Sequence, residues 1–134
     1  MSITWHVTDN TPEFRQGFER GIRAGLEAVG LQAERNVKLV TPVGQSYEGH
    51  TGGTLRQSIT HEVRGDSVFV GSNVKYAPYV ELGHHQEPGR YVPAIGKRLV
   101  RSWVPPHPYL EPGIMSGIGD YKTLLEMYIE ANLP

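Results

Sequence analysis

The 134-residue sequence contains no cysteine. Disulfide cross-links, thiolate-ligated zinc sites and cysteine nucleophiles are therefore excluded. The sequence also lacks an excess of either charge, because 13 Lys and Arg residues balance 14 Asp and Glu residues for a formal net charge of −1. We therefore do not expect nucleic-acid binding through bulk positive charge, although this balance is compatible with a local basic patch.

Long apolar runs are also missing. No stretch approaches the ~20 consecutive apolar residues that a membrane-spanning helix requires. Residues 1–6 lack a basic region followed by an apolar run, so no signal peptide is expected. Hydrophobic residues make up 38% of the chain and charged residues 20%. We expect one globular domain over residues 1–134, because two independent cores would be cramped at this length.

Hydrophobic spacing predicts two helices. An amphipathic helix is expected to start with Thr11 as its N-cap and Pro12 in its first turn, and to end before Pro42. A C-terminal helix is expected over residues 120–131. The apolar stripe of the first helix consists of Phe14, Phe18, Ile22, Leu26, Val29, Ala33 and Val37.

Alternating apolar and polar residues predict strands. Ile3, Trp5 and Val7 indicate a short N-terminal strand. A strand over residues 55–64 is predicted to form a hairpin with a more fully buried return strand over residues 68–70. A further strand is expected around residues 98–103. The positions of the first hairpin strand that should face the core are Leu55, Gln57, Ile59, His61 and Val63.

Glycine and proline indicate where the chain turns. Residues 42–54 and 84–93 have no helix or strand period and are expected to form exposed loops. Between the hairpin and the second loop, residues 76–83 contain Pro78 and end at Gly83. A single helical turn capped by this glycine is the predicted structure.

Motifs of enzymatic catalysis do not stand out. No serine lies in a Gly-x-Ser-x-Gly elbow, and residues 51–54 lack the lysine and glycine spacing of a phosphate-binding loop. We therefore expect neither an enzyme nor a cofactor. The alternative is a small metal-dependent hydrolase, because imidazole and carboxylate groups suit zinc or iron. Its candidate ligands are Glu81, His84, His85 and Glu87.

Aromatic and basic residues on the expected loops favour an interaction surface. Tyrosine, tryptophan and arginine dominate protein–protein interfaces. The aromatic residues without a predicted place in the core are Tyr47, Tyr76, Tyr79, Tyr91, Trp103 and Tyr109. A second alternative is nucleic-acid binding, because arginine interleaved with aromatic residues can contact phosphates and stack on bases. Its candidate residues are Arg90, Lys97, Arg98 and Arg101.

Five short motifs follow one another in a recognisable order. They are Thr41-Pro42-Val43, Thr51–Ile59, Val70–Asn73, Tyr76–Gly83 and Pro106–Pro112. This ordered set resembles the small tail-completion or head–tail joining proteins of long-tailed bacteriophages and prophages. The resemblance covers about residues 12–131. The sequence departs from the family pattern at Gly44–His50, which looks like an insertion, and at the extra glycine Gly53.

The resemblance implies an α+β fold. A long N-terminal amphipathic helix would pack on a small antiparallel β-sheet containing a central hairpin, with a C-terminal helix and long exposed loops. It also implies a structural virion protein that joins the capsid neck to the tail tube through ring assembly, most often as a hexamer. Such a protein is a tail terminator or an adjacent neck component, and these alternatives stay open.

Membership would also imply partners and a location. A neck or head-completion protein is expected on the capsid side of the ring, and the tail tube protein on the other side. DNA would pass through the ring without sequence-specific binding, and no membrane is expected to be involved. The protein would lie at the head–tail junction of the virion, and in the host cytoplasm during assembly.

We expect subunit and partner contacts in three segments: residues 44–53, 76–83 and 84–96. In the second segment, Glu81 is expected to pair with an arginine of a neighbouring copy. The alternative for Tyr76, Tyr79 and Leu82 is packing against the hairpin, and for Arg56 it is a charge on the strand surface. The candidate interface residues are Tyr47, Arg56, Tyr76, Tyr79, Glu81, His84, His85, Arg90 and Tyr91.

Overall fold

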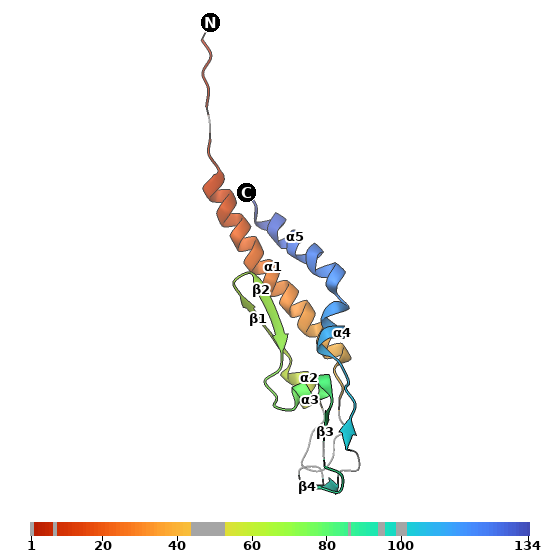
Figure 1. Ribbon diagram of the computed structural model, residues 1–134. Helices are drawn as coiled ribbons and strands as arrows, with labels where there is room; N and C mark the ends of the chain where they lie inside the picture. Colours follow the sequence, from red (N-terminus) through yellow and green to blue (C-terminus); the bar gives the residue numbers. More distant parts are fainter. Residues whose placement is uncertain (1, 7, 44–52, 86, 94–95, 99–101) are drawn as a thin grey trace.

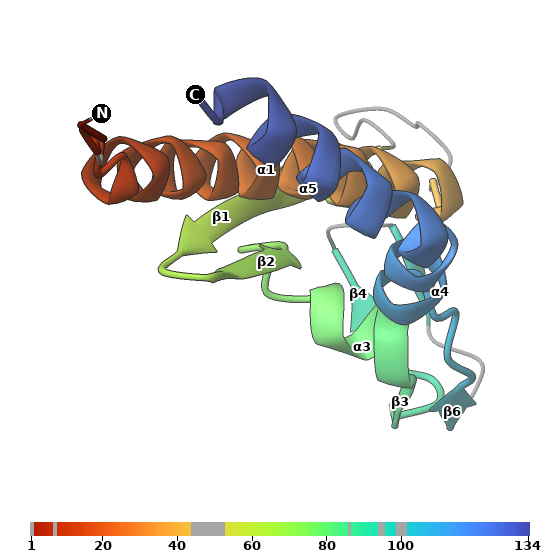
Figure 2. The ribbon, with the colours of Figure 1, turned by 90° about the horizontal axis from the view of Figure 1, so that it is seen from above.

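The computed structural model describes residues 2–6, 8–43, 53–85, 87–93, 96–98 and 102–134. It confirms the α+β fold with a long N-terminal helix, a β-hairpin and a C-terminal helix. The helices are α1 (Thr11–Val40), α2 (Thr54–Ser58), α3 (Ala77–Leu82), α4 (Leu110–Met115) and α5 (Ile118–Asn132). Figure 1 and Figure 2 show α5 running along α1, with the hairpin on another side of α1.

The start of α1 differs in detail from the prediction. Thr11 is the first helical residue, whereas Asn10 takes the N-cap position without a side-chain hydrogen bond. The backbone N–H of Thr11 donates to Oδ1 of Asp9 at 2.9 Å. The carboxylate therefore satisfies a free donor of the first turn, and Thr11 does not act as the predicted cap. Pro12 lies in the first turn, where its missing N–H is tolerated.

The face of α1 that meets α5 is lined with glycine. Gly17, Gly21 and Gly25 are buried and lie four residues apart, so they share one face of the helix. A Cβ added at Gly21 would lie 2.6 Å from a backbone atom of α5. The two helices therefore approach closely because these side chains are missing. The predicted apolar stripe is only partly buried, since Phe14 and Phe18 are 50% and 40% exposed.

The hairpin is confirmed and is shorter than predicted. Strands β1 (Thr60–Arg64) and β2 (Ser67–Gly71) are antiparallel. Residues 54–58 form α2 instead of extending β1. Leu55 and Ile59, four residues apart, both reach the core, as one face of a helical turn allows, whereas Gln57 is exposed. The prediction that the whole return strand is buried is wrong at Phe69, which is 51% exposed.

The other described strands are short. Strand β3 (His84–His85) pairs with β6 (Trp103–Val104), and β4 (Tyr91–Val92) pairs with β5 (Lys97–Arg98). The described strands thus form three two-stranded antiparallel sheets. The loop predicted over residues 84–93 contains two of these strands, β3 and β4. The ends of the strand predicted around residues 98–103 pair with different partners, and residues 99–101 lie outside the described part.

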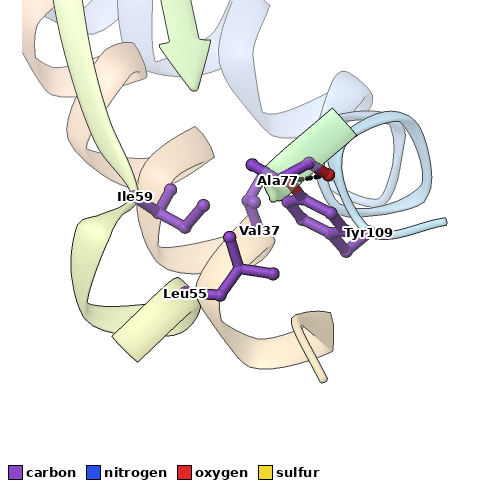
Figure 3. Close-up of a cluster of buried hydrophobic side chains, with 5 residues drawn as sticks. All are labelled: Val37, Leu55, Ile59, Ala77 and Tyr109. Atoms are coloured by element: carbon purple, nitrogen blue, oxygen red, sulfur yellow. Dashed lines mark hydrogen bonds between the residues drawn. The ribbon is translucent and has the colours of Figure 1, made fainter. Parts of the chain in front are cut away.

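A small core connects the C-terminal half of α1 to α2 and α3. Figure 3 shows the cluster, which consists of Val37, Leu55, Ile59, Ala77 and Tyr109. Tyr109 is 0% exposed, and its hydroxyl donates to the backbone oxygen of Ala77 at 3.1 Å. Its predicted place among surface aromatic residues is therefore wrong. The helical turn over residues 77–82 is confirmed, and Gly83 ends it with a left-handed φ of 75°.

Before α1, the described residues 2–6 and 8–10 form what we call the N-terminal arm. The predicted strand is not formed there, because no described strand lies beside the arm to pair with it. Ile3 and Trp5 are 73% and 84% exposed. Figure 1 shows the arm continuing away from the end of α1 that is remote from α3.

Candidate interaction surface

Glu81 ties α3 to the start of α4. Its Oε2 accepts hydrogen bonds from the backbone N–H groups of Tyr109 at 2.7 Å and Leu110 at 3.1 Å. Its Oε1 accepts one from Glu111 at 3.4 Å. These N–H groups belong to the N-cap and the first two residues of α4, where the helix itself offers no acceptor. The predicted ion pair of Glu81 with a neighbouring copy would have to form beside these three bonds.

The opposite side of α3 is open. Tyr76, Tyr79 and Leu82 are 43%, 55% and 71% exposed, so packing against the hairpin does not cover them. Ala77 instead faces the core, and Val80 packs partly against it. The short helix therefore presents an apolar and aromatic face to its surroundings, as an interface requires.

Next to α3 lies a mostly apolar cavity of about 440 Å³, which we call the α3 pocket. It opens to the surface. Its walls come from the end of β2, the connection to α3, α3 itself and the start of α4. The lining residues are Gly71, Ser72, Asn73, Val74, Lys75, Ala77, Pro78, Glu81, Leu82, Tyr109 and Leu110. No sequence pattern indicated this pocket, because its walls come from segments about 30 residues apart.

His84 and His85 are adjacent residues of β3. Their rings contact different partners, Tyr79 at 5.5 Å and Trp103 at 4.8 Å between ring centroids. Neighbouring strand residues point to opposite faces, so the two imidazoles do not converge on one point. In the part of the chain that the structure describes, no group of three or more potential ligands is placed to hold a metal ion. The proposed ligand Glu87 is exposed.

Among the basic residues near β4 and β5, Arg98 makes contacts within the chain. The Arg98 guanidinium lies 5.9 Å from the centre of the Tyr91 ring, and its Nη1 donates to the backbone oxygen of Gly89 at 3.0 Å. Arg90, Tyr91 and Lys97 are exposed. Three of the four predicted phosphate-binding residues therefore lie on one small hairpin, and Arg101 lies outside the described residues.

Arg56 closes the C-terminal end of α1. Its Nη2 donates to the backbone oxygen of Thr41 at 3.0 Å, and the buried hydroxyl of Thr41 donates to the oxygen of Val37 at 2.6 Å. Both bonds satisfy carbonyl groups at the end of the helix. Arg56 is on α2 rather than on a strand surface. Its interface role stays a prediction, and Tyr47 lies outside the described residues.

A polar cluster that the sequence did not reveal attaches the hairpin to α1. Nε2 of His61 lies 3.0 Å from Glu27, and Nδ1 lies 3.3 Å from Glu34. Partial burial lowers the pKa of His61. The hydrogen bonds with the two glutamates and their negative charges outweigh this effect, so the pKa is raised overall. The ring packs against Gly30, where there is no side chain to obstruct it. Periodicity had placed His61 in the core because it does not report such long-range pairs.

Among the described residues, no helix is long and apolar enough to span a bilayer. A family model described as "Bacteriophage HK97-gp10, putative tail-component" matches residues 7–83. This segment includes α1, α2, the hairpin and α3, and it is more than half of the chain. No curated protein and no solved structure matches the chain. The segment matched by the family model includes most of the residues that line the α3 pocket, whereas α4 and α5 lie beyond this segment.

Proposed function

The chain belongs to the HK97-gp10-like family of bacteriophage tail components, and from this premise we propose that it joins the capsid neck to the tail tube through ring assembly. The role is structural and non-enzymatic. Family membership is the observation that carries the proposal, because it makes the chain a part of the virion tail. A ring of identical subunits, most simply a hexamer, suits a junction through which DNA must pass.

The exposed surface of the single chain supports assembly. Large apolar side chains are exposed along α1, on β2, on α3 and on α5. Such extensive apolar exposure is typical of subunits whose surfaces become buried in a complex.

Two distinct apolar patches lie far apart on the molecule. One is the outer face of α3, with Tyr79 and Leu82, and the other is the N-terminal end of α1, with Phe14 and Phe18. Figure 1 shows these elements at opposite ends of the long helix. A closed ring with head-to-tail contacts requires two different patches on every subunit, so this distribution favours a cyclic assembly.

The proposed ring has a different partner on each side. A neck or head-completion protein would contact it on the capsid side, and the tail tube protein on the tail side. We place it at the head–tail junction after assembly in the host cytoplasm. With a formal net charge of −1 per chain, a channel of low net charge would let DNA pass without tight binding.

The geometry gives no support to the hydrolase alternative. The carboxylate of Glu81 is occupied by three backbone donors. His84 and His85 are directed to different aromatic partners. A hydrolytic metal centre would need these groups to converge around one ion and leave a position for water.

The first experiment measures the mass of the purified protein by light scattering, alone and mixed with purified tail tubes. We expect either a ring mass in solution or transfer of the chain onto tube ends. Tubes from tails that already carry this protein serve as the matched control and should recruit no more of it. A chain that stays monomeric and ignores both tubes and capsids would contradict the joining role.

A further inference from the structure

We propose that the N-terminal arm of one copy docks into the α3 pocket of a second copy, with Trp5 as its anchor. This inference rests on the proposed ring assembly and specifies one contact within it. Neither the arm's role nor the pocket follows from the family description. Residues 2–6 precede the matched segment, which begins at residue 7.

The arm carries large apolar side chains that are mostly exposed. Trp5 is 84% exposed and Ile3 is 73% exposed. They alternate with Ser2, Thr4 and His6, so both can lie on one side of an extended segment. A tryptophan that protrudes from an extended arm is well suited to anchor an interface, because tryptophan is the most enriched type among residues that dominate binding energy.

The α3 pocket has matching chemistry and size. Val74, Ala77, Pro78 and Leu82 provide apolar walls, and the volume of about 440 Å³ lies within the ~300–1,000 Å³ range of ligand pockets. Leu82 is 71% exposed beside the opening, so an inserted ring would cover it. Burying a large aromatic side chain against these walls supplies the apolar area on which interfaces depend.

The arm cannot reach the pocket of its own chain. Trp5 precedes Thr11 by six residues, which span at most about 21 Å when extended. The pocket shares Tyr109 and Ala77 with the core cluster around Val37. Val37 lies 26 residues along α1 from Thr11, which corresponds to about 39 Å of helix. An arm that enters an α3 pocket must therefore belong to another copy of the chain.

This contact is head-to-tail, because it joins two different surfaces. Every subunit offers one arm and one pocket, so each arm can enter the pocket of the next subunit around a ring. Such contacts close a ring when the rotation that relates neighbouring subunits equals a full turn divided by a whole number. The arm and pocket thus give a physical basis for cyclic assembly of identical chains.

Two single variants remove the two halves of the contact. Trp5→Ala removes the anchor, and Leu82→Arg places a charge at the apolar opening. Both positions are exposed, so we expect their melting temperatures to match the wild type at protein concentrations too low for the wild type to assemble. Each variant alone should assemble at least tenfold more weakly in the light-scattering assay, whether in solution or on tail tubes.

Mixing the two variants provides the decisive readout. The Leu82→Arg chain retains an intact arm, and the Trp5→Ala chain retains an intact pocket. Together they should form a species of two chains that grows no further, because the two remaining surfaces are both defective. A mixture that stays monomeric, or single variants that assemble like the wild type, would overturn the inference.

Matched controls separate this contact from general surface effects. Leu39 is 72% exposed on α1 and does not line the pocket, so Leu39→Arg introduces the same charge at an equally exposed leucine. His6→Ala alters the arm beside the anchor. We expect both controls to assemble within about twofold of the wild type.

A peptide of residues 2–10 tests the contact without a ring. It should bind the Trp5→Ala chain with one site per chain and should not bind the Trp5→Ala/Leu82→Arg chain. Peptide binding by a chain that forms no ring and is not transferred onto tail tubes would contradict the proposed function while retaining the arm contact. A wild-type ring whose pocket ignores the peptide and tolerates Trp5→Ala would retain the function and overturn the arm contact.

Discussion

At the residue scale, the glycines of α1 decide how closely the two long helices pack. Gly21 is buried, and a Cβ there would lie 2.6 Å from Ile129 Cα and 2.9 Å from the Tyr128 backbone oxygen. We predict that Gly21→Ala destabilises the protein by about 1–3 kcal/mol, because the overlap with α5 outweighs the gain in helix propensity. Denaturant unfolding of both proteins measures the difference.

Gly119→Ala is the control for this prediction. Gly119 lies in α5, and nothing is within 4 Å of its added Cβ. The same substitution there should be neutral or stabilise by about 0.5–1 kcal/mol, since only the propensity changes. Equal stabilisation by both variants would show that the glycine face is not tightly packed.

Glu81 stabilises the start of α4 by accepting backbone hydrogen bonds. Glu81→Ala leaves the N–H groups of Tyr109 and Leu110 without their acceptor. We predict a loss of about 1–3 kcal/mol in the free energy of unfolding, and a smaller loss for Glu81→Gln, which retains one acceptor oxygen. The exposed Glu87, changed to alanine, should have little effect. Equal effects of both alanine variants would contradict this assignment.

At the scale of elements, His61 makes the attachment of the hairpin to α1 depend on pH. Its pKa in the folded protein is raised above the ordinary value of 6.5. The protonated ring can donate to Glu27 and Glu34 together, whereas a neutral ring can donate to only one of them. The stabilisation is fully present below about pH 6.5 and is lost as the pH rises through the folded pKa.

We therefore predict that the free energy of unfolding falls as the pH rises above about 6.5 and through the raised pKa of His61, because the interaction of this ring with Glu27 and Glu34 weakens. The comparison is with Glu27→Gln/Glu34→Gln, in which the decrease over this window should be smaller. Both proteins contain the same other histidines, so the difference between the two profiles isolates His61. Parallel profiles of the free energy of unfolding against pH would contradict the prediction.

At the scale of the whole molecule, few apolar side chains among the described residues are fully or nearly buried. They are Leu26, Ala33, Val37, Leu55, Ile59, Ala77 and Tyr109. We predict that the melting temperature of the assembling wild type rises with protein concentration, because subunit binding stabilises the folded state. Calorimetry over a hundredfold concentration range tests this, and Trp5→Ala should show a weaker dependence. A melting temperature independent of concentration would argue against assembly in solution.

Local spacing in the sequence was sufficient for several elements. Apolar residues three and four apart specified α1, because its regular stripe extends over many turns. Alternation before Gly65-Asp66 and a short apolar run after it specified the hairpin, and Pro78 with Gly83 specified the turn of α3. Motif order also indicated a phage tail family, which the family match supports. In each case the information lies within a short segment.

Tertiary contacts decided what local patterns left ambiguous or concealed. Residues 55–59 satisfy both a strand and a helix pattern, and the core selected the helix by taking Leu55 and Ile59 on one face. Tyr109 can lie in the core because the backbone oxygen of Ala77, 32 residues away in the sequence, accepts a hydrogen bond from its hydroxyl. The alternating arm formed no strand, since pairing requires a second edge. The α3 pocket likewise exists only because distant segments fold together, so sequence spacing could not reveal it.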